Sequence, residues 1–130
     1  MVPSKGEIDS YLKDVKAAIK IGHYKIARNE NRQDNRQLFE DYVLNEAKAK
    51  EILLSLETED FSSVVNNTNP GYPNEKLYIF GKDVSLVEKY SDIEIEKAVS
   101  LYIKFNKLEG PYVVVISFHE QKWALTYPFR

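Results

Sequence analysis

Three side chains near the C-terminus have the chemistry to cut a phosphodiester bond. Tyr102 and Lys104 alternate with apolar residues in one segment, and His119 closes the next apolar segment. Histidine exchanges a proton near neutral pH, lysine stabilises a developing negative charge, and tyrosine hydrogen-bonds a phosphate or stacks on a base. Without metal ligands beside them, these three residue types suit cleavage of RNA through its own 2′-hydroxyl group.

Two predicted strands must position these side chains. Leu101, Ile103 and Phe105 alternate with Tyr102, Lys104 and Asn106, and alternation resumes after the turn at Lys107–Pro111. In the second strand, we expect alternate residues to face the core (Tyr112, Val114, Ile116 and Phe118) or the opposite side (Val113, Val115, Ser117 and His119). A hairpin that pairs Tyr102 with Ser117 would place His119 on the diagonal, about 7–8 Å from Tyr102.

Length and composition exclude several classes of site. The 130 residues suit one domain spanning 1–130, and the absence of cysteine excludes disulfides and thiolate chemistry. With two histidines, a histidine-rich metal site is not expected, and we predict no metal and no cofactor. No apolar run approaches the roughly 20 residues that span a bilayer, and the N-terminus shows no secretory signal. We therefore expect a cytoplasmic protein without membrane contact.

The N-terminal half reads as helices. Ser4 and Glu7 form a capping-box pattern, Ile8 to Ile19 carry an apolar stripe at helical spacing, and Gly22 is a suitable stop. A short extended segment at 23–27 follows. A second helix is marked by apolar residues at 38–43, and Asn45 is a plausible cap for a third.

The stretch Arg28–Arg36 contains no apolar residue, so we expect an exposed loop. Its arginines are spaced four apart, which leaves two interpretations: a solvated loop of mixed charge, or a basic arm that holds a phosphate backbone. Under the second, the residues predicted to bind RNA come from the arm and the strands: Arg28, Arg32, Lys82, Lys122 and Tyr78.

The C-terminal half reads as strands. Leu77–Phe80 is a predicted strand, Gly81–Lys97 is expected to be partly irregular, and Trp123–Phe129 is expected to form a final edge strand because Pro128 cannot donate to a ladder. Helices followed by closely spaced strands favour an α+β class. We predict N-terminal helices packed on one face of a mostly antiparallel sheet of about four to five strands.

Several segments together resemble the MqsR family of bacterial toxins. They are similar to the family's opening VKK…G…R (Val15–Arg28), its apolar helix and S-x-S-D-F segment (Glu51–Phe61), its V-Y-L-K strand (Leu101–Lys104) and its closing I-V-S-F-K-E-K (Val115–Lys122). The resemblance implies a RelE-like fold, metal-independent cleavage of mRNA and a cognate antitoxin that blocks the toxin.

The resemblance also implies roles for single residues. Tyr102 matches the family's active-site tyrosine, and His119 stands where the family has a catalytic lysine. Ser63 stands where the family has a second lysine, so one cation is missing. Lys82, Lys104 or an arginine of the 28–36 arm would have to replace it.

Two other functions remain open. One is a non-catalytic module of the same fold that binds RNA or protein, which the serine at position 63 favours. The other is an interaction protein whose Trp123–Phe129 edge pairs with a partner strand. Trp123 itself reads either as an anchor at the sheet edge or as a platform on which a base stacks.

Overall fold

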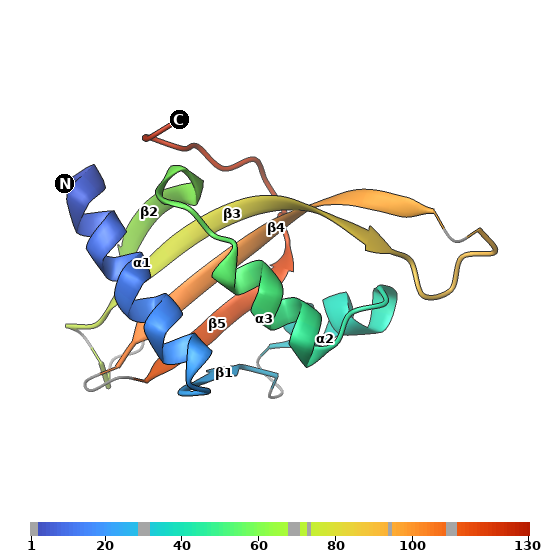
Figure 1. Cartoon of the computed structure of the whole chain (residues 1–130), viewed down its shortest axis with the longest axis horizontal. Helices are drawn as coiled ribbons and strands as arrows, with labels where there is room; N and C mark the ends of the chain where they lie inside the picture. The colour runs from blue at the N-terminus through green and yellow to red at the C-terminus, as the bar shows by residue number, and fades with distance from the viewer. Residues whose placement is uncertain (1–2, 29–31, 68–70, 73, 94, 109–111) are drawn as a thin grey trace.

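The structure is a computed structural model that describes residues 3–28, 32–67, 71–72, 74–93, 95–108 and 112–130. Within these residues, helices come first and most strands follow, as Figure 1 shows. The elements are α1 (Lys5–Lys20), β1 (Tyr24–Ile26), α2 (Gln33–Asp41), α3 (Glu46–Leu54), η1 (Thr58–Asp60), β2 (Phe61–Asn66), β3 (Lys76–Val87), β4 (Glu96–Lys107) and β5 (Val113–Glu120). The predicted α+β class is confirmed.

Helix α1 begins and ends where its sequence predicts. The hydroxyl of Ser4 accepts a hydrogen bond from the backbone N–H of Glu7, whose carboxylate accepts one from the N–H of Ser4. Gly22 follows the helix with a φ of 81°, a left-handed conformation that costs glycine little. The apolar stripe from Ile8 to Ile19 is buried, so α1 lies with one face on the sheet.

Helix α2 begins earlier than expected. Gln33–Arg36, predicted to continue the loop, forms its first turn. The prediction was wrong because a helix without an apolar stripe gives no periodic signal, and this turn is held by Asn35 rather than by burial of apolar side chains. The centre of the arm, 29–31, lies outside the described residues. Helix α3 begins after Asn45, whose side chain caps it as predicted.

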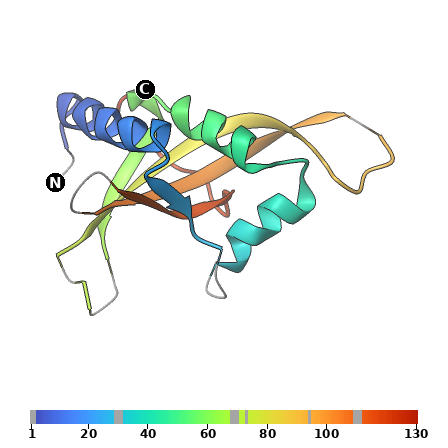
Figure 2. The ribbon, with the colours of Figure 1, turned by 60° about the horizontal axis from the view of Figure 1, so that its bottom comes forward.

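The strands form one five-stranded sheet in the order β1-β5-β4-β3-β2. Strand β1 runs parallel to β5, and the other described pairs are antiparallel. Figure 2 shows α1 and α3 above this sheet, which buries Leu12, Leu53, Phe80 and Phe118 between the two layers. The opposite surface of the sheet, called the open face below, carries the polar side chains of β4 and β5.

Strands β3 and β4 are longer than predicted. The segment Gly81–Lys97, expected to be partly irregular, continues β3 to Val87 and begins β4 at Glu96. Its charges had suggested a loop, but the exposed Asp83 and Ser85 alternate with the half-buried Val84 and the buried Leu86, and all four pair along β4. The resulting hairpin projects well beyond the other strands (Figure 1).

A β-bulge in β5 changes which of its side chains face the core. Lys104 pairs with Ser117, whereas Phe105 pairs with Val115, so Ile116 is an extra residue. Before the bulge, Val113 and Val115 are buried under the helices, contrary to the prediction that Val114 and Ile116 would face the core. After the bulge, Phe118 faces the core and His119 the open face, as predicted. The bulge could not be predicted from the sequence, because the neighbouring residues are all valine or isoleucine and fit either face.

The C-terminal segment is not a strand. Residues 121–130, called the tail below, leave β5, pass behind the sheet in the view of Figure 1 and end near η1. The predicted edge strand Trp123–Phe129 is therefore wrong: Leu125 and Tyr127 pack against Gly81 on the open face instead of joining a ladder. Pairing of a partner strand with this segment loses its structural basis.

Among the described residues, none of the helices has the length and apolar character that crossing a bilayer requires.

Candidate functional site

Two cross-strand rows of side chains on the open face bring the predicted catalytic residues together. Gly81, Tyr102 and His119 are register partners in the first row. Lys104 and Ser117 are partners in the second row, two residues along β4. The predicted pairing of Tyr102 with Ser117 was wrong by two residues, because the turn between the strands did not determine the register. The observed register brings Tyr102 and His119 closer than the predicted one.

The rings of Tyr102 and His119 are stacked. Their centroids are 5.1 Å apart and their planes differ by 13°. Nδ1 of His119 lies 2.7 Å from the backbone carbonyl oxygen of Glu120. Because a carbonyl only accepts, Nδ1 carries the hydrogen, and in the neutral ring Nε2 keeps its lone pair. The histidine is therefore oriented as a base that acts through Nε2.

Burial alters the acidity of both neighbours of the histidine. It raises the pKa of Tyr102, which therefore stays protonated and can donate a hydrogen bond at neutral pH. Burial also lowers the pKa of Lys104, and the positive charge of Arg32 lowers it further. The charged form of Lys104 is therefore disfavoured in free energy in the folded protein. An anion bound near Lys104 and Arg32 would offset this penalty.

Helix α2 flanks the histidine on the outer side of β5. Asp34 and Lys122 form an ion pair of 2.7 Å, and together with His119 they line a hollow of about 160 Å³. The hydrogen bond from Lys122 and its charge lower the pKa of Asp34, and His119 acts in the same direction. Of the residues predicted to bind RNA, Arg32 and Lys122 are thus near the three catalytic candidates.

Asn35 joins α2 to the bulge of β5. Its side-chain amide donates to the carbonyl oxygens of Ala27 and Ile116, at 2.7 and 2.8 Å, and its oxygen accepts from the N–H of Phe118 at 2.8 Å. Strand β1 ends at Ile26, opposite Val115, so Asn35 takes over as the partner of the β5 edge. Sequence reasoning missed Asn35, because a buried asparagine in a charged stretch looks like any loop residue.

Tyr78 and Lys82 do not belong to the site. Both lie on the helix-covered face, where Tyr78 stacks on Tyr11 with ring centroids 3.7 Å apart. Lys82 pairs with the buried carboxylate of Asp60 at 3.4 Å and donates to the carbonyl oxygen of Ser55. Both point to the same face as the buried Phe80, so the structure does not bring these two predicted RNA-binding residues together with His119.

Arg28 is held by the helices. Its guanidinium group pairs with Glu46 at the start of α3 and lies 3.9 Å from the ring centroid of Phe39. These contacts tie the end of β1 to α2 and α3. Arg28 therefore has a structural role, apart from the Tyr102–His119 stack.

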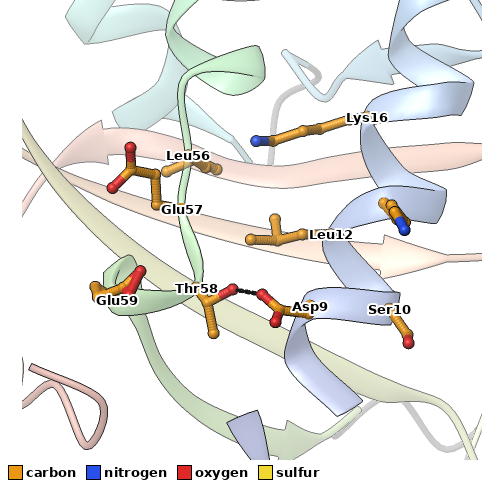
Figure 3. A pocket seen from close by; sticks show the side chains of 9 residues that line it. Asp9, Ser10, Leu12, Lys16, Leu56, Glu57, Thr58 and Glu59 are labelled. Carbon is orange, nitrogen blue, oxygen red and sulfur yellow. Dashed lines mark hydrogen bonds between the residues drawn. The ribbon is translucent and has the colours of Figure 1, made fainter. Parts of the chain in front are cut away.

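A groove of about 480 Å³ lies on the opposite side of the sheet, between α1 and the segment that leads into η1. Figure 3 shows Leu12 and Leu56 at its apolar part, Lys16 reaching across it, and Asp9 bonded to the hydroxyl of Thr58. The sheet separates this groove from Tyr102 and His119. At its rim, Glu57 caps η1 and Glu59 lies within it.

In the part of the chain that the structure describes, no group of three or more histidine and acidic residues is arranged to hold a metal ion. No family model, curated protein or solved structure matches the chain. The resemblance to the MqsR family stays a prediction.

Proposed function

We propose that this protein is a metal-independent endoribonuclease, the toxin of a toxin–antitoxin pair, that cleaves mRNA through the 2′-hydroxyl group. The observation that carries the proposal is the Tyr102–His119 stack with Lys104 two residues along the same strand. An imidazole, a phenol and an ammonium group thus face the same solvent from adjacent positions. These groups are those that transesterification of RNA needs.

The reaction assigns a role to each group. Nε2 of His119 takes the proton of the 2′-hydroxyl, whose oxygen then bonds to phosphorus. Lys104 stabilises the added negative charge on the phosphate oxygens, and Arg32, whose charge acts on Lys104, adds to the positive potential there. The bond from phosphorus to the 5′ oxygen breaks, and Tyr102 supplies the proton that this oxygen needs. The products are a 2′,3′-cyclic phosphate and a 5′-hydroxyl end.

Arg32 and Lys122 extend the cationic surface on which the RNA backbone would lie. Lys122 is neutralised by Asp34 in the free protein. A phosphate would have to displace the carboxylate of Asp34 to bind Lys122, so this lysine contributes to RNA binding only where the phosphate replaces that ion pair. This arrangement supports a local binding site on a chain whose net charge is −2.

The biological setting follows from the proposal. A nuclease that cuts mRNA acts in the cytoplasm and must be restrained, so we infer a cognate antitoxin protein that covers the open face. A protein that is obtained only when it is co-expressed with the product of a neighbouring gene would agree with this setting.

A second candidate is a module of the same fold that binds RNA or protein without cleaving it. Ser63 favours this alternative. It shares the row of Ile79, Lys104 and Ser117, yet provides no charge. Tight RNA binding without any product would decide for this module.

The test is cleavage of a mixed mRNA substrate by the purified protein in the presence of a chelator. We expect cuts with cyclic phosphate ends, and a rate about 10²–10⁴-fold lower for His119→Ala. His23→Ala is the matched control, since His23 precedes β1 rather than lining the open face. Uncut RNA, or equal cutting by His119→Ala, would reject the nuclease.

A further inference from the structure

The tail carries an aromatic side chain to the catalytic candidates. Trp123 lies two residues past Gln121, and its ring meets that of Tyr102 edge to face, with centroids 5.9 Å apart and planes at 65°. Trp123 remains 62% exposed. Trp123, Tyr102 and His119 therefore form a continuous series of three rings, of which only the outermost has most of its surface in water.

The tail is anchored on both sides of Trp123. At Gln121, the backbone N–H donates to the carbonyl oxygen of Ser100 at 2.8 Å, and the side chain donates to that of Leu101 at 3.0 Å. At the other end, Phe129 stacks on Phe61, and Arg130 bonds to Asp60 at 3.1 Å. Trp123 is thus presented by a segment that is fixed at both ends.

Packing does not explain why a tryptophan stands at this position. A large aromatic ring gains free energy chiefly by burial, and Trp123 forgoes most of that gain. Anchoring the tail does not require Trp123 either, because Leu125, Tyr127 and Phe129 make its contacts with the sheet. An exposed ring beside a cationic site is the arrangement that proteins use to stack an unpaired base while the phosphate is held nearby.

We propose that Trp123 stacks on an unpaired nucleobase of single-stranded RNA, adjacent to the phosphate at His119. This inference rests on the proposed function, which supplies RNA as the ligand. It adds a reason why the site would prefer unpaired RNA. Lys104, Lys122 and Arg32 favour a polyanion over an apolar peptide as the occupant. Because every base has a stacking face, Trp123 selects unpaired over paired RNA rather than one base over another.

The experiment uses the natural fluorescence of Trp123, the single tryptophan of the chain. The full-length protein is titrated with a short RNA that is 2′-O-methylated at every position. This RNA lacks the attacking hydroxyl and cannot be cut. We expect saturable quenching by the single strand and at least a 5-fold weaker effect from the same sequence as a duplex. An oligonucleotide whose central sites are abasic should bind without quenching.

Affinity is then measured by anisotropy of labelled RNA, which does not depend on the tryptophan. Trp123→Leu should bind about 5- to 150-fold more weakly, the range typical for loss of one stacked base, and Trp123→Phe should retain part of the affinity. Tyr90→Ala is the control, because Tyr90 is 85% exposed at the far hairpin and should not affect binding.

The outcomes separate this inference from the nuclease. If RNA quenches the wild-type fluorescence and Trp123→Leu binds more weakly, but wild type does not cleave unmodified RNA, stacking is supported and the nuclease is rejected. If wild type cleaves unmodified RNA but Trp123→Leu binds RNA as tightly as wild type does, stacking is rejected and the nuclease is retained. Equal quenching by abasic and natural oligonucleotides, or no binding of any single strand, would overturn the inference in the wild-type protein, independently of how the variants fold.

Discussion

The backbone N–H of Phe118 donates a hydrogen bond to the side-chain oxygen of Asn35, 83 positions away in the sequence. Asn35 is 1% exposed, and its amide nitrogen bonds to two further backbone oxygens. One helix residue thus bonds to two backbone groups along the edge of β5, at the bulge that precedes His119, and to a third at Ala27, just past the end of β1. The position of the histidine therefore depends on a residue outside the sheet.

Replacing Asn35 is expected to destabilise the fold. Asn35→Ala leaves buried backbone groups without partners, so the free energy of unfolding should fall by about 1–3 kcal/mol or more. Asn35→Asp should be no milder at neutral pH, because it turns a carboxylate oxygen toward two carbonyl oxygens. Urea denaturation measures both changes. Gln37→Ala on the exposed side of α2 is the control, and equal midpoints for Asn35→Ala and Gln37→Ala would contradict the role of Asn35.

Gly81→Ala is expected to displace the tail. A Cβ atom at Gly81 would lie 2.8 Å from Leu125 Cδ1 and 2.9 Å from Gln121 Nε2, and closer still to the Tyr127 hydroxyl. Such overpacking typically costs about 1–3 kcal/mol. Limited proteolysis should release the C-terminal residues faster than in wild type. Gly6→Ala, which meets no close atom, is the control, and added Tyr127→Phe should restore part of the stability.

The sequence predicts more of the helix layer than of the open face. The cap at Ser4, the stripe of α1 and the glycine stop are local signals, and each has one structural solution. The register of β4 with β5 is not local: it depends on the bulge at Ile116 and on the edge held by Asn35. The alternation of side chains therefore predicted the correct face for His119, whereas its cross-strand partner, which depends on the register, was predicted wrongly.

Long-range contacts also explain why the predictions for Lys82 and for the tail differ from the structure. Lys82 looks like a surface cation in the sequence, yet it neutralises Asp60 together with Arg130. The tail has the composition of a strand, but its apolar side chains pack across the sheet at Gly81. Neither outcome can be predicted without knowing which distant segment comes near.

Lys104→Met is expected to stabilise the protein while it weakens RNA binding. Burial and the charge of Arg32 lower the pKa of Lys104. At pH 7 the charged lysine therefore costs free energy in the folded state that it does not cost in the unfolded state. As the pH rises from the lowered pKa toward 10.5, the unfolded chain also releases this proton and the penalty disappears.

The stability gain of Lys104→Met over wild type should thus be largest near neutral pH and shrink as the pH approaches 10.5. Denaturation curves at several pH values measure it. Lys76→Met, at the exposed start of β3, should change stability by less than about 0.5 kcal/mol. A variant at position 104 that is less stable than wild type at pH 7 would show that the charge is compensated within the fold.

Tyr102→Phe is expected to slow cleavage without loosening the fold. The phenyl ring keeps the stack on His119 and the edge contact with Trp123, but it cannot supply a proton to the leaving oxygen. We expect a rate about 10²-fold lower under single-turnover conditions and a nearly unchanged melting temperature. Tyr72→Phe, at an exposed tyrosine, should cut at the wild-type rate. Full activity of Tyr102→Phe would assign the proton to another donor.

Ser63→Lys is expected to strengthen RNA binding by adding a cation to the second row of the open face. Ser63 pairs with Ile79, which pairs with Lys104, so a lysine there would point to the same side as the catalytic candidates. The slope of a plot of log affinity against log salt concentration should become more negative by about 0.7, the value for one further phosphate contact in a single strand. Ser10→Lys makes the same change of charge on α1, on the other side of the sheet. Because net charge acts on both variants alike, a gain confined to Ser63→Lys would locate the RNA on the open face, and an equal gain from Ser10→Lys would place it elsewhere.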